Sequence, residues 1–321
     1  MTNPANALST ADGIPTASRA TGALIGLDIG GTKTHGVRFE NGVPVAESIA
    51  GSANVQNVSR EAARAHLAEL FADIGYGNVV QVCAGAGGID TEADAEALKA
   101  LIAPFAPKAL TNIVHDSRLL LAAGCVSSGV AVIAGTGSAA WGRNPRGVEA
   151  RTGGWGYLLG DEGSGYWLGR EAVRHSLRRM NQGCEPDALT RGLLAACDLD
   201  HPNQLIALFH SAGTGRRYWA QQARLVVDAA DAGHLPSQKM LDRAGQDLAH
   251  MTTQTLSQLG ITGPVVLGGG LGMHVPRLQS AFREALAEDG ITDVRPVTQA
   301  PVFGVTQLAG ETSAAVGLAI P

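Results

Sequence analysis

The sequence ALIGLDIGGTKTHGVRFE, residues 23–40, decides the fold, because it joins two apolar runs through a glycine pair, two threonines and a lysine. The apolar run at 23–30 is typical of a buried strand, and residues 35–40 predict a second strand that returns beside it. Glycines at the end of a strand leave backbone N–H groups free to face an anion. The segment therefore predicts a phosphate-binding hairpin, although a plain hairpin turn accounts for these residues equally well.

This turn differs from a Walker A loop, because Thr32 separates the glycine pair from Lys33 and a strand is expected to follow instead of a helix. Asp28, at the end of the first strand, can hold Mg²⁺ through water, since that ion keeps several of its own waters. The candidate phosphate ligands of the turn are Gly30, Gly31, Thr32, Lys33 and Thr34.

A second segment, GVAVIAGTGSAAWGRN at residues 129–144, repeats the order of buried strand, glycine turn and return strand. Its candidate phosphate ligands are Gly135, Thr136, Gly137 and Ser138. The spacing Gly135-x-Gly137 also matches a degenerate dinucleotide fingerprint, but that motif needs a helix directly afterwards. The sequence Trp141–Pro145 contains glycine and proline and is typical of a helix break, so a second phosphate hairpin is the better interpretation.

A third glycine turn follows the apolar run PVVL at residues 264–267. Gly268, Gly269 and Gly270 would let a flat ring or a ribose lie against the backbone. By itself this turn is explained better as an ordinary strand-to-helix connection.

The remaining pattern predicts that the chain has two similar halves. Strands are expected over 23–30, 35–40, 43–50, 79–86, 112–116, 129–137, 139–144, 264–270 and 293–298. Helices are expected over 59–74, from 91, from 117, over 276–288 and 305–319, and across 163–259 with breaks at Gly183, Pro186, Pro202, Gly213 and Pro236. Each half opens with a strand, a glycine turn and a return strand. Two similar lobes imply a cleft between them, where ligands commonly bind.

Composition excludes several classes of function. The chain has 321 residues and a formal net charge of −5, which gives no basic surface for nucleic acid or an anionic membrane. No apolar run is long enough to span a membrane. The four cysteines show no CxxC spacing, which favours a reduced, cytoplasmic protein. Residues 1–22 are small and polar, lack the pattern of a secretory signal, and are expected to form a disordered tail.

The three turns, together with GGWGYLLGDEGSG at residues 153–165, resemble the BadF/BadG/BcrA/BcrD ATPase family of the actin, Hsp70 and sugar-kinase superfamily. That family includes N-acetylglucosamine kinase and bacterial glucosamine kinase. The resemblance covers nearly all of the chain after residue 22. It implies an α/β, two-lobed actin-like ATPase built from duplicated ribonuclease H-like domains, with one lobe at 23–117 that is completed by a helix at 305–321, and the other at 118–304. It also implies ATP and Mg²⁺ as cofactors and a homodimer.

Phosphoryl transfer to an alcohol needs a carboxylate that accepts the hydroxyl proton. Asp116 ends the predicted strand at 112–116 and lies at the start of a helix. From the residues alone, a general base and a cap for a helix beginning at Ser117 are equally good interpretations. The family resemblance places the general base at Asp116.

The same resemblance assigns the sugar site to Asn54, Asp116, Thr136, Trp155 and Asp161. Asp161 can also be interpreted as a helix cap, and Trp155 as a core aromatic residue. The chain departs from the animal N-acetylglucosamine kinases at Ala86 and Ala139, where those enzymes carry a serine and an asparagine, and this leaves the exact sugar open. We expect an ATP-dependent kinase for the 6-hydroxyl of an amino sugar, N-acetylglucosamine or glucosamine, with a slight preference for the former.

Three other functions remain as alternatives, besides a kinase for another hexose. An activator ATPase of an acyl-CoA dehydratase holds an iron–sulfur cluster through cysteines, and the cysteines here are scattered. A kinase-derived sugar sensor usually adds a DNA-binding helix-turn-helix, for which the N-terminal segment is expected to be too short. A nicotinamide-dependent oxidoreductase would rely on the Gly135-x-Gly137 spacing alone.

Overall fold

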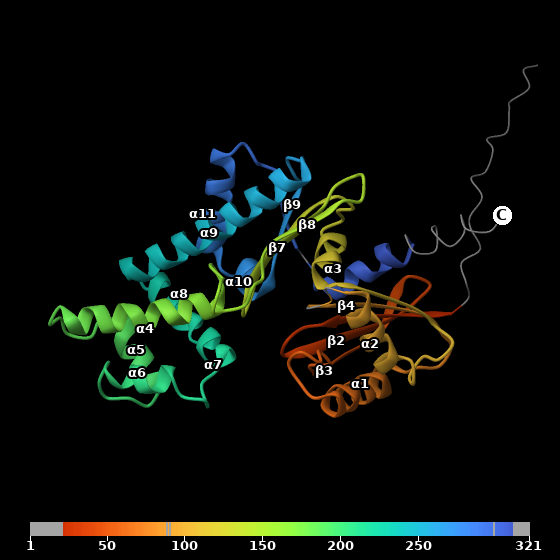
Figure 1. Ribbon diagram of the computed structural model, residues 1–321, viewed down its shortest axis with the longest axis horizontal. Coiled ribbons are helices and arrows are strands. Elements are labelled where there is room, and N and C mark those ends of the chain that lie inside the picture. The colour runs from red at the N-terminus through yellow and green to blue at the C-terminus, as the bar shows by residue number, and fades with distance from the viewer. Residues whose placement is uncertain (1–21, 88, 90, 298, 311–321) are drawn as a thin grey trace, which may run out of the picture.

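The computed structural model describes residues 22–310 except residues 88, 90 and 298, and contains two five-stranded sheets with the same strand order (Figure 1). The first sheet has the order β3-β2-β1-β4-β5 and the second β8-β7-β6-β9-β10. In each sheet the first three strands are antiparallel and the last two run parallel to the first. This match confirms the predicted duplication. The strands are β1 Ala23–Ile29, β2 Lys33–Glu40, β3 Val43–Gly51, β4 Val79–Ala86, β5 Leu110–His115, β6 Gly129–Ala134, β7 Ser138–Arg143, β8 Glu149–Gly153, β9 Val265–Gly268 and β10 Val294–Pro296.

Alternation along β1 sets the two faces of the first sheet. Ile25, Leu27 and Ile29 are buried beneath α1 (Arg60–Ile74) and α2 (Glu92–Ile102). The even-numbered positions, Asp28 among them, therefore face the other side. Because β1, β4 and β5 are parallel, the residues that follow them meet at one edge of the sheet, which is the usual place for a ligand in such folds.

The second sheet carries a large helical layer. The long helix α9 (Leu235–Leu259) packs across β6, β7 and β8, and α11 (Pro276–Glu288) packs on α9 (Figure 1). The other helices are α4 Gly165–Asn181, α5 Ala188–Ala196, α6 Gln204–Phe209, α7 Arg216–Gln221, α8 Ala223–Asp231 and α10 Gly269–His274. The predicted break at Pro236 is confirmed: α8 ends at Asp231 and α9 begins at Leu235, so Pro236 lies in the first turn of α9, where a missing N–H costs no hydrogen bond. No strand was predicted at β8.

The helix α3 (Asp116–Ala123) connects the two sheets. Leu119 packs into the core that the first sheet shares with the segment η1 (Pro301–Gly304), whereas Leu120 and Leu121 pack into a core with Trp141 and Val266 of the second sheet. Residues 305–310 are helical, as predicted, and return to the first sheet; the rest of the predicted 305–321 helix and the 1–21 part of the predicted tail lie outside the described residues. The lobe boundary at 117/118 stays a prediction. Within the described part of the chain, no helix is long and apolar enough to cross a membrane.

The contact of η1 with α3 gives a stability prediction. A Cβ atom on Gly304 would lie 2.5 Å from the carbonyl oxygen of Leu119 and 2.6 Å from the nitrogen of Ala123, which are helix backbone atoms that cannot easily move. We expect Gly304→Ala to lower the free energy of unfolding by about 1–3 kcal/mol, measured by urea denaturation. Gly310→Ala, which meets open space, is the control and should stay within about 0.5 kcal/mol. Equal effects of the two changes would contradict this packing.

Candidate active site

A cavity of about 370 Å³ lies between the two halves of the molecule and brings the three predicted glycine turns together. Thr32 contributes from the β1–β2 turn, Gly135 and Thr136 from the β6–β7 turn, and Gly270 from the start of α10. These turns are separated by roughly a hundred residues or more in sequence, yet each follows a strand at the corresponding edge of its sheet. Gly165, Arg217, Ala220, Gln221 and Leu271 complete the lining. The contribution of α7 was not predicted, because no motif marks that helix.

The β6–β7 turn is bound to the segment 161–166 by four hydrogen bonds. The N–H of Ser138 donates to Asp161 Oδ1 at 3.3 Å, and its hydroxyl donates to the carbonyl of Glu162 at 2.6 Å. The N–H groups of Gly165 and Tyr166 donate to the carbonyls of Gly135 and Thr136. Two motifs that the sequence presents separately are therefore one structural unit.

Asp161 is not a helix cap, because Ser164 takes that role by accepting a hydrogen bond from the N–H of Trp167. The Asp161 side chain is only 2% exposed, and its backbone has a φ of 64°, which is unusual for a residue other than glycine. Its Oδ2 atom lies 3.0 Å from Nη2 of Arg216, the first residue of α7. A buried carboxylate held in this way is suited to bind a polar ligand.

The loop before Asp161 exposes apolar side chains. Trp155 is 65% exposed, so it is not a core residue, and Leu158 and Leu159 are exposed as well. A Cβ atom on Gly160 would lie 3.9 Å from Cβ of Trp155 and 3.6 Å from Oε2 of Glu162. The indole is therefore available to a ligand from the loop that leads to Asp161.

The β1–β2 turn is supported from β3 and the loop after it. Thr34 is fully buried, and its hydroxyl accepts a hydrogen bond from the N–H of Ala53 at 2.9 Å, which places that hydroxyl in the interior. Ser52 donates to the carbonyl of Gly30 at 2.7 Å. Lys33 is exposed. In the first turn, Thr32 lines the cavity, whereas Thr34 fixes the course of the chain toward Asn54.

Asn54 and Asp116 meet at the end of β4. The amide of Asn54 donates to the carbonyl of Gly87 at 2.9 Å, and a Cβ atom on Gly87 would lie 3.2 Å from Oδ2 of Asp116. His115, not Asp116, caps α3, because its Nδ1 accepts from the N–H of Ser117. Asp116 Oδ1 lies 3.0 Å from that same Nδ1 but has no hydrogen-bond partner among the described residues. The side chain of Asp116 as a whole is 26% exposed, so a ligand can reach this carboxylate although Oδ1 itself is buried.

Asp28 and Asp116 are close enough to influence each other's charge. Burial, followed by the negative charge of Asp116, raises the pKa of Asp28 to about 7, although the positive charge of Lys33 acts in the opposite direction. Ionisation of two neighbouring carboxylates that are largely removed from water is disfavoured unless a cation lies near them. This pair therefore fits a divalent cation with oxygen ligands.

The third turn places its glycines differently. Gly268 ends β9, and Gly269 has a φ of 81° and packs against Ala134, where a Cβ atom would lie 2.5 Å from the carbonyl oxygen. Only Gly270 lines the cavity. The first two glycines thus bring the start of α10 close to the β6–β7 turn, and the third borders the ligand space.

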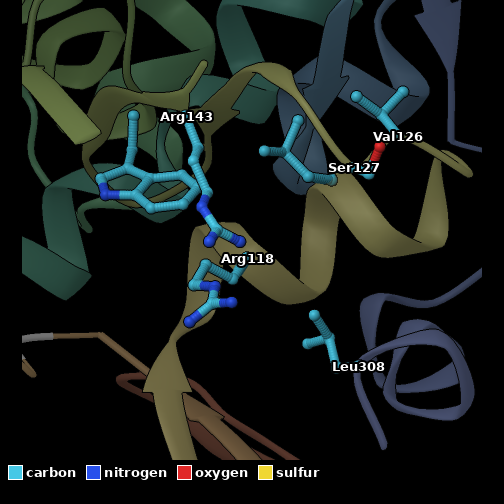
Figure 2. A pocket seen from close by; sticks show the side chains of 7 residues that line it. Arg118, Val126, Ser127, Arg143 and Leu308 are labelled. Atoms are coloured by element: carbon cyan, nitrogen blue, oxygen red, sulfur yellow. The ribbon is translucent and has the colours of Figure 1, made fainter. Parts of the chain in front are cut away.

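A much smaller hollow of about 10 Å³ lies where α3 meets β7 (Figure 2). The side chains of Arg118, Arg143 and Leu308 are among those that line it. The space suffices for about one water molecule. This hollow belongs to the connection between the lobes and not to the ligand cavity.

Residues 25–304 match the model of the BadF/BadG/BcrA/BcrD ATPase family. The N-acetylmuramic acid/N-acetylglucosamine kinase of Clostridium acetobutylicum is 30% identical over 275 residues, which cover 82% of this chain and 90% of that protein. The N-acetyl-D-glucosamine kinase of Dictyostelium discoideum is 30% identical over 269 residues, with 77% and 84% covered.

Two solved structures share the fold. A protein of Chromobacterium violaceum, whose name proposes an N-acetylglucosamine kinase, has a TM-score of 0.70 at 25% identity and covers 88% of this chain and 97% of its own. A ROK family glucokinase of Streptomyces griseus, in complex with glucose and AMPPNP, has a TM-score of 0.56 at 15% identity and covers 89% and 99%. These likenesses confirm the predicted two-lobed, actin-like fold. The chain belongs to the BadF/BadG/BcrA/BcrD ATPase family.

Proposed function

We propose that this protein is an ATP-dependent kinase that phosphorylates the 6-hydroxyl of an amino sugar, N-acetylglucosamine or glucosamine. The observation that carries this proposal is the cavity in which Thr32, the β6–β7 turn and Gly270 converge. The two curated relatives, which are named as sugar kinases, support it over the activator alternative. The homodimer stays a prediction.

The triphosphate of ATP would lie between Thr32 on one side and Gly135 and Thr136 on the other, with the nucleoside toward Gly270 and Leu271. Backbone N–H groups in such turns hold phosphate oxygens without any need to reorganise during the reaction. Since one turn comes from each lobe, binding of the nucleotide would also hold the lobes at a fixed separation.

Asp116 would accept the proton of the sugar hydroxyl as the oxygen attacks the γ-phosphorus. Its partly exposed carboxylate and its place beside Gly87 and Asn54 support this role. Asp28, on the face of β1 that α3 covers, would hold Mg²⁺ through water. When bound, Mg²⁺ supplies positive charge that offsets the phosphates and the two carboxylates.

The sugar would be bound by Asn54 and Asp161, whose oxygens can accept hydrogen bonds from ring hydroxyls. Trp155 offers an apolar wall for the methyl of an acetamido group. Its exposure, on the loop that leads to Asp161, supports this choice and favours N-acetylglucosamine.

The base assignment predicts a loss of turnover in Asp116→Asn. We expect kcat to fall roughly 10²–10⁴-fold, because the amide cannot accept the proton, while sugar affinity measured by calorimetry changes little. Glu92→Gln, in the exposed first turn of α2, is the matched control and should retain full activity. A near-normal kcat in Asp116→Asn would show that another group is the base.

The sugar assignment predicts an order of kcat/KM for three acceptors, N-acetylglucosamine first, glucosamine next and glucose last. Trp155→Ala should lower the value for N-acetylglucosamine about 10- to 200-fold, the range for losing a small apolar group's contacts, and should affect glucose less. Tyr76→Ala removes another exposed aromatic side chain and should change neither value. A preference for glucose, a ketose or a polyol would contradict the amino-sugar assignment but not the kinase.

The raised pKa of Asp28 predicts a pH-dependent stability of the ligand-free protein. In the unfolded chain this carboxyl loses its proton near pH 4, whereas in the folded protein it keeps it until about pH 7, so wild-type stability falls between these values. Asp28→Asn replaces the carboxyl with a neutral amide, so its stability does not fall for this reason between pH 4 and pH 7. Its unfolding temperature should exceed that of wild type by an amount that grows from pH 4 to pH 7 and is then constant, at about 2–4 °C for each kcal/mol.

Asp231→Asn, at an exposed position on α8, is the control and should show no such trend. If the unfolding temperatures of Asp28→Asn and wild type differed by the same amount at every pH, the proposed environment of Asp28 would be contradicted.

A further inference from the structure

Arg216 lies between the proposed nucleotide and sugar sites. The helix α7 packs on α4 so closely that a Cβ atom on Gly169 would lie 2.0 Å from the carbonyl oxygen of Trp219. From the first position of α7 the Arg216 side chain reaches back to the β6–β7 turn, where a Cβ atom on Gly137 would lie 1.8 Å from its Nη2. The guanidinium therefore rests on the bare backbone of Gly137. The next residue, Arg217, lines the nucleotide cavity.

The ion pair of Arg216 with Asp161 is incomplete. Nη2 and Oδ2 are 3.0 Å apart, yet Oδ2 of Asp161 and Nε of Arg216 are both buried and have no hydrogen-bond partner among the described residues. Buried polar atoms without partners are uncommon in folded proteins, because each one loses its hydrogen bonds to water and gains none in return. A ligand that offers a donor to Oδ2 and an acceptor to Nε would satisfy both.

The two ligands of the proposed reaction supply these groups. A sugar hydroxyl donates to the carboxylate, and a phosphoryl oxygen accepts from the guanidinium, which binds phosphates with several N–H groups at once. Because Gly137 belongs to the turn that would hold the phosphates, the guanidinium lies against the proposed phosphate site. Arg216 is also 38% exposed at its side chain, so a ligand can reach it.

We propose that Arg216 is a catalytic residue that contacts the transferring phosphoryl group, and that Asp161 neutralises its charge while the site is empty. This rests on the proposed kinase function. In the transfer, the bond between the γ-phosphorus and the oxygen bridging it to the β-phosphate breaks, and a bond to the sugar 6-oxygen forms. The hydroxyl proton passes to Asp116. Arg216 keeps all its protons and stabilises the negative charge on the γ-phosphoryl oxygens.

The alternative is that Arg216 only orients Asp161 toward the sugar. The two roles affect different constants. Loss of a contact made mainly in the transition state lowers kcat, whereas loss of orientation of a sugar-binding carboxylate raises the sugar KM and leaves kcat nearly unchanged.

The test compares Arg216→Ala, Arg216→Lys and the control Arg224→Ala, which removes an exposed arginine of α8. With ATP and the best acceptor sugar of the wild type, Arg216→Ala should lower kcat about 10³-fold, the lower end for a phosphate-stabilising arginine, and both KM values should change less than about threefold. Arg216→Lys should recover only part of kcat, since an ammonium lacks the planar fork. Added guanidinium ion should partly restore Arg216→Ala, and Arg224→Ala should match the wild type.

An unchanged kcat with a raised sugar KM would overturn the proposal in favour of orientation, and unchanged constants would overturn both roles. An absence of sugar phosphorylation by the wild type would instead count against the kinase function itself. Unfolding temperatures and the affinity for a non-hydrolysable ATP analogue would verify that each variant is folded, and the lysine variant keeps the test valid if the alanine variant is not.

Discussion

The hydrogen bonds between the β6–β7 turn and the segment 161–166 are the constraint on which the active site depends. Ser138 donates twice, to the Asp161 carboxylate and to the Glu162 carbonyl, and two further backbone bonds hold Gly165 and Tyr166 to the same turn. A turn that faces phosphates and a carboxylate that faces the sugar are thereby fixed to each other. The start of α4, and α7 packed against it, follow from the same attachment.

The other half of the site depends on the duplicated topology. In both sheets the hairpin turn and the ends of the parallel strands lie at one edge, so placing the two sheets with these edges facing one another assembles a site from both halves. The helix α3 joins the sheets, with Leu119 in one core and Leu120 in another, and its first residue is Asp116. The proposed base is thus at the connection between the lobes, where a change in their separation would move it relative to the phosphate turns.

The sequence predicted the elements whose signals are local. Buried strands followed by glycine turns are recognisable from composition, and the structure places Thr32, Gly135, Thr136 and Gly270 around one cavity. The sequence could not reveal that His115 caps α3 in place of Asp116, since the choice depends on the direction of the side chains. The role of Arg216 could not be predicted for another reason: its partner Asp161 is more than fifty residues away in the sequence, and α7 carries no motif. The strand β8 was missed because EARTG has little apolar content.

The account's central claim is that two hairpin turns and Asp116 form one phosphoryl-transfer site between the lobes. A crystal structure with a non-hydrolysable ATP analogue, Mg²⁺ and N-acetylglucosamine tests it most directly. We expect the triphosphate between Thr32 and the turn at Gly135 and Thr136, and the sugar 6-hydroxyl within about 2.6–3.2 Å of an Asp116 oxygen. A nucleotide bound outside this cavity, or a 6-hydroxyl out of reach of Asp116, would contradict the account.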